Sequence, residues 1–255
     1  MTKHANLLKN LVIRDLKHRY VGSIGGFMWS IAQPVSQLLI YWFAFTVVFQ
    51  TQLDVDAPGV NVPVFLLAGL LPWFLFTDTI MRNCSVLTDN AALITKTTIP
   101  AEILPLAITL SNLVTHGAGL IVILAALAGL RHVPLSAIGI FLYLPILLLF
   151  AQGIAWIVSG LQVFVRDTIQ VLQIVIAAWF WLTPVMYGAN RLKDFAQIAM
   201  LSPVAVSVTG YRQSLLGLSQ PPALQVALAA AISLAVFFVG ALFFRRAKPA
   251  FADVL

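Results

Sequence analysis

Charged residues are scarce in this chain of 255 residues. They make up 9% of it, against 60% hydrophobic residues, and the mean hydropathy is +0.96. A soluble globular domain carries about 25% charged residues, so this composition cannot cover a water-exposed surface of ordinary kind. The scarcity excludes a soluble protein and predicts one that folds in lipid.

Other residues and motifs are also missing. Cys84 is the only cysteine, so no intrachain disulfide can form. No lysine stands in the glycine-rich pattern of a phosphate-binding loop, and no serine stands in a nucleophile elbow. The histidines lack the spacing of metal ligands, which favours packing or interfacial roles for His4, His18, His116 and His132. We expect no enzymatic activity, no metal site and no ATPase within the chain itself.

Long apolar segments are abundant, and six have the roughly 20 residues that a membrane-spanning helix needs. They are Phe27–Gln50, Pro63–Leu87, Ile103–Leu130, Ile138–Val165, Thr168–Tyr187 and Ala223–Phe244. Six spans place both termini on one side of the membrane. With both termini in the cytoplasm, eleven basic residues lie inside and four outside, as the preference of lysine and arginine for the cytoplasmic side requires.

The predicted fold is therefore an all-α membrane protein with one transmembrane domain over residues 1–255. Residues 1–24 form a cytoplasmic interface helix, 27–187 the first five spans, 188–222 an outer region, 223–244 the sixth span and 245–255 a cytoplasmic tail. In the outer region, Asn190–Met200 and Pro203–Leu216 are too short to span but apolar enough to dip into the interface. We predict short re-entrant helices there.

The N-terminal segment is basic and has helical periodicity. An apolar stripe runs along it, formed by Leu8, Val12, Leu16 and Tyr20. Asp15 and Arg19 fall beside this stripe rather than opposite it, which favours a helix that touches lipid on one side and protein on another. Gly22–Gly26 then forms a joint into the first span.

Charges within or beside the spans are few. Asp78 and Arg82 are four residues apart and share one face of a helix, which favours a structural ion pair over a transport role. Arg166 and Asp167 separate the fourth and fifth spans by two residues, so they predict a tight helical hairpin at the cytoplasmic side.

The first and fifth spans each carry one face of amides followed by aromatic rings. The faces are Gln33, Gln37, Tyr41, Phe45 and Phe49 in the first span, and Gln170, Gln173, Ala177, Phe180 and Trp181 in the fifth. Amides bind hydroxyl groups and aromatic faces offer apolar area, so together they suit a path for a sugar. The alternative is that the amides join helices and the rings form an interfacial belt.

Several sequence blocks resemble those of the membrane subunits of ABC exporters for polysaccharides and polyol phosphates. The blocks, in this order along the chain, are Arg14–Tyr20, Gly25–Trp29, Gln33–Pro34, Gly69–Trp73, Asn90–Lys96, Ile99–Pro100, Glu102–Pro105, Val163–Asp167, Leu182–Tyr187, Ser202–Pro203 and Tyr211–Arg212. The resemblance covers essentially the whole chain. It departs from the family pattern after Lys96, where a second basic residue and an aromatic residue before Pro100 are missing.

The resemblance implies a homodimer that binds two copies of a separate ATPase subunit, which holds ATP and magnesium. The first and fifth helices of both copies would line the channel, and re-entrant helices would cover its outer mouth. The N-terminal helix and the second cytoplasmic loop would contact the ATPase. The coupling residues are then Arg14, Asp15, Arg19, Asn90, Lys96, Arg166 and Asp167.

The function that follows is export of a lipid-linked polysaccharide, O-antigen first among the candidates, across the cell inner membrane. Capsule or teichoic acid export remains an alternative, as does a small-molecule ABC efflux permease. A secondary transporter is disfavoured, because it would show inverted repeats or broken helices around a midplane site. Nothing in the composition points to nucleic acid.

Overall fold

The computed structural model describes residues 2–20, 28, 32, 36, 39–40, 43–48, 62–96, 99–129, 133–188 and 196–255. Within these ranges every regular element is a helix, and no strand occurs. The elements are α1 (Thr2–Tyr20), η1 (Ala44–Val48), α3 (Val62–Asp89), α4 (Ala91–Lys96), α5 (Ile103–Gly129), η2 (Leu135–Gly139), α6 (Ile140–Phe164), α7 (Thr168–Leu182), α8 (Ala196–Ala199), α9 (Pro203–Leu216), α10 (Ala223–Ala247), η4 (Lys248–Ala250) and α11 (Phe251–Val254).

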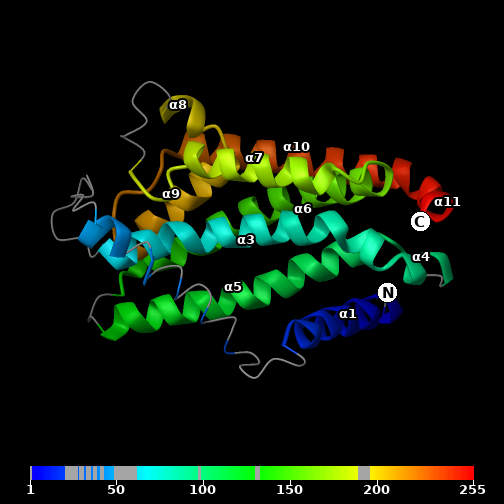
Figure 1. Cartoon of the computed structure of the whole chain (residues 1–255). Coiled ribbons are helices and arrows are strands. Elements are labelled where there is room, and N and C mark those ends of the chain that lie inside the picture. The colour runs from blue at the N-terminus through cyan, green and yellow to red at the C-terminus, as the bar shows by residue number, and fades with distance from the viewer. Residues whose placement is uncertain are drawn as a thin grey trace.

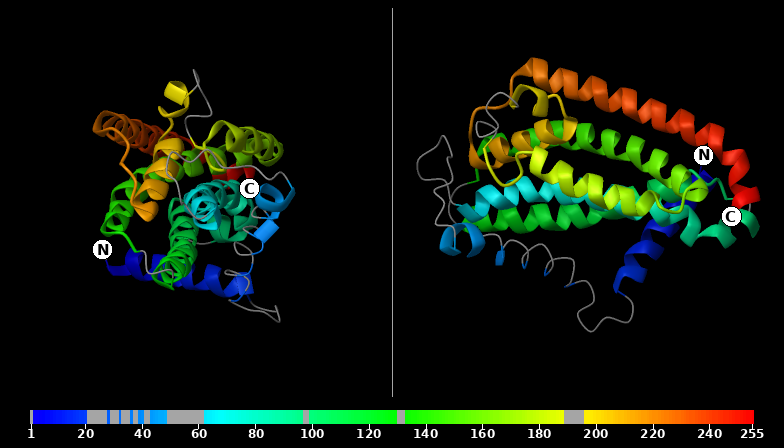
Figure 2. Two further views of the ribbon diagram at one scale, coloured as in Figure 1. Left: turned by 90° about the vertical axis from the view of Figure 1, so that its left-hand side faces the viewer. Right: turned by 45° about the horizontal axis from the view of Figure 1, so that its top comes forward.

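The long helices form a bundle with two different ends (Figure 1). The two chain termini, α4 and α11 lie at one end, which we call the terminal end. Helices α8 and α9 lie at the other, which we call the α9 end. Helix α1 lies on one side of the bundle next to α5, whereas α7 and α10 lie on the opposite side (Figure 2).

Helix α3 occupies the centre of the bundle. In the apolar stretch of α3, 78% is buried, whereas in that of α10 only 17% is buried, so α10 presents most of its apolar surface outward. Helix α6 packs extensively on both α3 and α10 and joins the centre to this outer helix. Apolar side chains such as Phe76, Leu147 and Phe150 fill the space between α3 and α6. A long helix with most of its apolar side chains facing outward fits a protein that is surrounded by lipid.

Four helices are long and apolar enough to cross a membrane: Val64–Asp89, Ile103–Gly129, Leu135–Phe164 and Ala223–Ala250. They match the second, third, fourth and sixth predicted spans, so the multi-pass helical class is confirmed. The fifth predicted span, Thr168–Tyr187, is shorter in the structure, because α7 ends at Leu182. Pro184 explains this end, since proline lacks an N–H donor and disfavours helical conformation in the residue before it.

Several predictions concern residues outside the described ranges. The first predicted span is described only at a few positions and in η1, so its length is not established. The joint Gly22–Gly26 lies outside the described residues, as does most of Asn190–Met200. Helix α9 occupies the predicted residues Pro203–Leu216, and it packs on α3 and α6 with most of its side chains buried. Its depth in a membrane stays a prediction.

Candidate functional site

A network of charged and polar side chains attaches α1 to the bundle. Asp15 accepts a hydrogen bond from Arg82 Nη2 of α3 at 2.5 Å, and it also accepts one from the Ser111 hydroxyl of α5. Arg19, one turn further along α1, lies 3.5 Å from the Asp15 carboxylate and donates to the side chain of Asn112. Arg82 donates to the same Asn112 oxygen at 2.7 Å. Two arginines therefore share one carboxylate and one amide, which fixes α1 to α3 and α5 together.

This network corrects one prediction. Arg82 does not pair with Asp78; among the described residues its carboxylate partner is Asp15. Asp78 is exposed on α3, although it stands one turn before Arg82. The four-residue spacing places Asp78 and Arg82 on one face of α3. It cannot reveal that α1 brings the carboxylate of Asp15 to Arg82.

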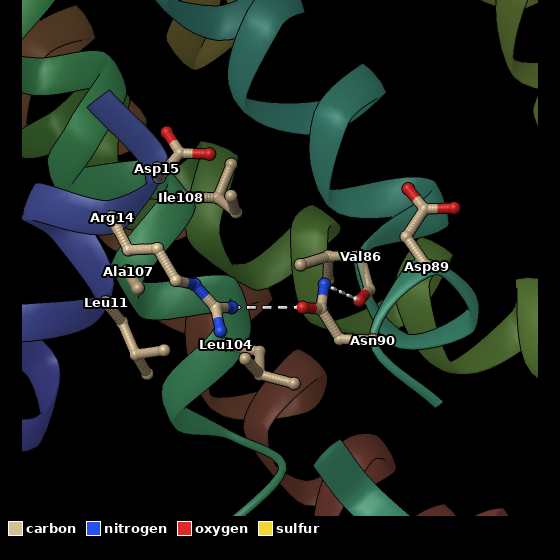
Figure 3. Close-up of a pocket in the computed structure, with 9 residues that line it drawn as sticks. All are labelled: Leu11, Arg14, Asp15, Val86, Asp89, Asn90, Leu104, Ala107 and Ile108. Carbon is tan, nitrogen blue, oxygen red and sulfur yellow. Dashed lines mark hydrogen bonds between the residues drawn. The ribbon is translucent and has the colours of Figure 1, made fainter. Parts of the chain in front are cut away.

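A pocket of about 360 Å³ opens between α1, the end of α3 and the start of α5 (Figure 3). Arg14 reaches across it and donates to Asn90 Oδ1 at 3.1 Å, while the Asn90 amide donates to the Val86 carbonyl at 2.9 Å. Arg14 of α1 and Asn90 at the α3–α4 corner are thus brought together, and their role in coupling to an ATPase stays a prediction. The pocket is lined by Leu11, Arg14, Asp15, Val86, Asp89, Asn90, Leu104, Ala107 and Ile108.

Three residues of the coupling set, Lys96, Arg166 and Asp167, are not among those that line this pocket. Arg166 and Asp167 are exposed in a tight turn between α6 and α7, which confirms the predicted hairpin. Gln162, a residue that the sequence analysis missed, holds this turn: its amide donates to the Arg166 carbonyl at 3.0 Å, and its oxygen accepts from the Ile169 N–H at 3.0 Å. Lys96 belongs to α4, but its side chain lies outside the described residues.

Helix α7 presents the predicted polar and aromatic face outward. Gln170, Gln173, Ala177 and Trp181 are all exposed, and Trp181 is 64% exposed. The aromatic residues on the other side attach the helix to the bundle: Trp179 packs edge-on against Phe76 at 5.1 Å, and Phe180 against Trp73 at 5.4 Å. Phe180 is therefore half-buried, and it contributes less to the open face than predicted. Amides followed by a ring thus line a helix face that the described residues leave uncovered.

The matching face of the first span cannot be compared. Gln33, Gln37, Tyr41 and Phe49 lie outside the described residues. Phe45 belongs to η1, but its side chain also lies outside them. Whether the two faces meet stays a prediction.

The histidine and cysteine that the structure describes in full are buried. His116 of α5 is 5% exposed and makes a 3.1 Å hydrogen bond with the Tyr211 hydroxyl of α9, which confirms a packing role. Cys84 is a free, buried thiol. In the part of the chain that the structure describes, no group of histidine, cysteine or acidic residues could hold a metal ion.

Arg212 of α9 is one of the four basic residues that the six-span topology places outside, and its side chain is only 4% exposed. Its three nitrogens donate to carbonyl oxygens of Phe65, Pro184, Val185 and Tyr187. Nothing near it in sequence reveals this burial, because the partners are 25 or more residues away.

Comparison with known proteins gives consistent matches. The family model described as ABC-2 type transporter matches residues 6–216. The chain is 28% identical to the O-antigen export system permease protein RfbA of Myxococcus xanthus over 255 residues, which cover 98% of this chain and 96% of that relative. It is 29% identical to the protein of the same name from Klebsiella pneumoniae, with 98% and 95% covered. A shorter match of 83 residues, 30% identical, covers 32% of this chain and 31% of the polysialic acid transport protein KpsM of Escherichia coli.

Proposed function

Because the chain belongs to the ABC-2 type transporter family, we propose that it is the channel-forming permease subunit of an ATP-driven exporter of a lipid-linked polysaccharide. The observation that carries the proposal is the similarity to O-antigen export permeases along 98% of the chain. O-antigen is accordingly the polymer we favour. The permease lies in the inner membrane as a homodimer with two copies of an ATPase subunit, which holds ATP and magnesium.

The proposed topology has six spans, with the first within residues 27–50 and both termini in the cytoplasm. The terminal end of the bundle is then the cytoplasmic end, and the α9 end is the outer end. Helix α7, at 15 residues, is about 22 Å long, which is less than the roughly 30 Å of hydrocarbon that a span must cross. The residues after Leu182 complete the crossing within protein, and short helices of the outer region cover the channel mouth.

The proposed mechanism starts at the α1–α4 surface. ATP binding and hydrolysis in the partner push on α1 and on the α3–α4 corner, where Arg14 meets Asn90. The network around Asp15 passes this movement to α3 and α5, and the seam between α7 and the first span opens. The polymer then slides past amides and rings, which bind it weakly at several points and so allow it to leave as well as enter.

The test is to remove the proposed lining rings. We expect the variant Tyr41→Ala, Phe45→Ala, Trp181→Ala to lower surface polysaccharide about tenfold or more at normal expression, because each ring contributes stacking area to the sugar path. ATPase activity of the membranes is measured in parallel. A control variant, Phe141→Ala with Phe238→Ala, removes from α6 and α10 two rings that are about as exposed as Trp181, and export should continue. Unchanged export in the triple variant refutes the lining assignment.

A capsule-type polymer is the second candidate, and the shorter match to KpsM favours it. Deleting the gene separates the two: loss of the polysaccharide ladder on lipopolysaccharide supports O-antigen, whereas loss of capsule alone supports the alternative. Co-purification separates both from a secondary transporter, since an ABC permease in detergent should retain its ATPase subunit.

A further inference from the structure

Arg212 is a buried cation without a carboxylate partner among the described residues. Nη1 donates to the carbonyls of Pro184 at 3.0 Å and Tyr187 at 3.1 Å, and Nη2 donates to that of Val185 at 2.5 Å. Its guanidinium carbon lies 3.8 Å above the Phe65 ring. Partial negative charge from carbonyls and a ring face thus replaces a counter-ion.

The carbonyls that Arg212 binds belong to the segment directly after α7. Thr183, Val185 and Met186 in this segment are at most 2% exposed, so water does not reach their backbone. Helix α7 ends at Leu182, so the segment lacks the internal hydrogen bonds of a helix. Within a membrane, non-helical backbone is tolerated where it is buried in protein or where it lines a water-filled cavity, and buried backbone needs protein donors and acceptors. Arg212 supplies these donors from α9.

The close fit around Arg212 shows that the site is built for it. Gly69 of α3 faces the guanidinium, and a Cβ atom there would lie within 3.0 Å of both Arg212 Nη2 and the Val185 oxygen. Only glycine leaves room for the arginine at this point. The preceding residue, Tyr211, hydrogen-bonds His116 of α5, so adjacent residues of α9 hold α5 on one side and α3 with the end of α7 on the other.

The end of α7 carries the exposed ring of the proposed path. Trp181 stands one residue before the end of the helix, and its carbonyl accepts a hydrogen bond from the Tyr187 hydroxyl. Arg212 binds the carbonyl of the same Tyr187 at 3.1 Å. The position of the Trp181 ring therefore depends on a segment whose backbone Arg212 fixes.

We propose that Arg212 is a positioning residue for export: from α9 it clamps residues 184–187 and so sets where the outer end of α7 presents Trp181 to the polymer. The effect on export rests on the proposed function, whereas the contact between Arg212 and residues 184–187 exists without any substrate. It assigns to α9 a second task besides covering the mouth, namely to fix one wall of the path.

The experiment compares Arg212→Met, which keeps an unbranched apolar stem but loses all donors, with Arg212→Lys, which keeps the charge but not the planar fork. A spin label is placed at Leu182→Cys, which is 65% exposed at the end of α7, in the purified permease–ATPase complex. Buried Cys84 is not expected to react. Labels at Leu224→Cys, 71% exposed at the start of α10, and the variant Arg246→Met serve as controls.

In Arg212→Met we expect a more mobile label at position 182 but not at position 224, and export lowered about tenfold, because several charge-assisted hydrogen bonds are lost together. ATP hydrolysis by the complex continues. Arg212→Lys should show smaller changes in label mobility and in export than Arg212→Met. Arg246→Met should change neither the label mobility nor the export. If Arg212→Met does not accumulate, the label in Arg212→Lys still reports the loosening.

Two results overturn the proposal. An unchanged label mobility at position 182 in both variants shows that Arg212 does not fix this segment. A loosened label with normal export shows that the clamp is structural only. Failure of the proposed sugar path is separate, since it is read from the Tyr41, Phe45 and Trp181 variant, in which Arg212 is intact.

Discussion

At the scale of residues, arginines are neutralised in two ways. Arg82 lies beside the carboxylate of Asp15, and both side chains keep some exposure, at 30% and 16%. Arg212 is bound by carbonyls alone and is 4% exposed. A partly exposed ion pair can separate at a small cost in free energy, because water replaces the lost partner. A buried cation cannot leave its acceptors without a large cost in free energy, because no water replaces them. The first arrangement suits a contact that moves during transport, and the second suits a fixed point.

A third charge contact, between Glu102 and Lys248, predicts a dependence of stability on pH. Burial acts to raise the pKa of Glu102, but the Lys248 ammonium, which donates to both carboxylate oxygens at 3.0 and 2.8 Å, together with the charge of Arg245 holds this pKa below its usual 4.5. A lowered pKa means that the pair stabilises the fold above pH 4.5 and loses this effect as the pH falls through the folded-state pKa.

We therefore expect Glu102→Gln to lower the melting temperature of the purified protein slightly at pH 7 and not at strongly acid pH. The effect is small, below about 1 kcal/mol, because both side chains are roughly two-fifths exposed. The measurement is a double-mutant cycle with Lys248→Gln, repeated across the pH range. A coupling energy that grows as the pH falls would contradict the assignment.

At the scale of elements, hydropathy predicts helices better than it predicts their contacts. The bounds of α3, α5, α6 and α10 follow the apolar runs closely, because lipid requires continuous apolar helices. The end of α7 does not follow the apolar run, because the run continues through Pro184 whereas the helix ends at Leu182. The partner of Arg82 also could not be predicted, because Asp15 lies 67 residues away and the packing of α1 decides the contact. The exposed face of Gln170 and Trp181 was predictable from helical spacing alone.

The contact between α6 and α10 depends on two glycines. A Cβ at Gly153 would lie 2.5 Å from the Val236 carbonyl oxygen, and one at Gly240 would meet the Gly153 backbone. Small residues are what allow helices to approach closely in lipid, where no hydrophobic force drives them together. Since α10 is mostly uncovered elsewhere, this crossing is its main attachment.

Gly153→Ala should therefore destabilise the protein by about 1–3 kcal/mol, as overpacking of a close contact does. The measurement is the melting temperature in detergent and the amount of protein in membranes. Gly117→Ala is the matched control, because nothing lies within 4 Å of the added Cβ in α5. The control should be neutral or slightly stabilising, since alanine favours a helix by about 0.5–1 kcal/mol over glycine. Equal stability of the two variants would show that α6 and α10 do not meet at Gly153.

At the scale of the whole molecule, the two ends of the bundle differ in how their parts are joined. The terminal end combines a buried apolar cluster, which includes Leu11, Leu104 and Phe251, with polar contacts that stay partly exposed, such as Asp15 with Arg82. The α9 end is held by buried contacts, with Arg212 and Tyr211 at their centre. In the proposed mechanism the terminal end is the driven end, so its hydrated polar contacts can shift while the α9 end keeps its geometry.

Replacing Asp15 and Arg19 together by alanine should uncouple ATP hydrolysis from export while leaving membrane insertion intact. The double change conserves net charge, so the positive-inside signal is kept. It removes the links from α1 to Ser111, Asn112 and Arg82. Helix α1 then keeps mainly its packing on α5 and the Arg14–Asn90 bond, so a push on α1 moves α3 and α5 much less. The measured quantity is surface polysaccharide per ATP hydrolysed, expected to fall about tenfold because several charge-assisted hydrogen bonds are lost. Lys9→Ala, at an exposed position of the same helix, should keep the wild-type ratio. If the double variant keeps it as well, the force reaches the channel without α1, and the α3–α4 corner at Asn90 becomes the route to examine.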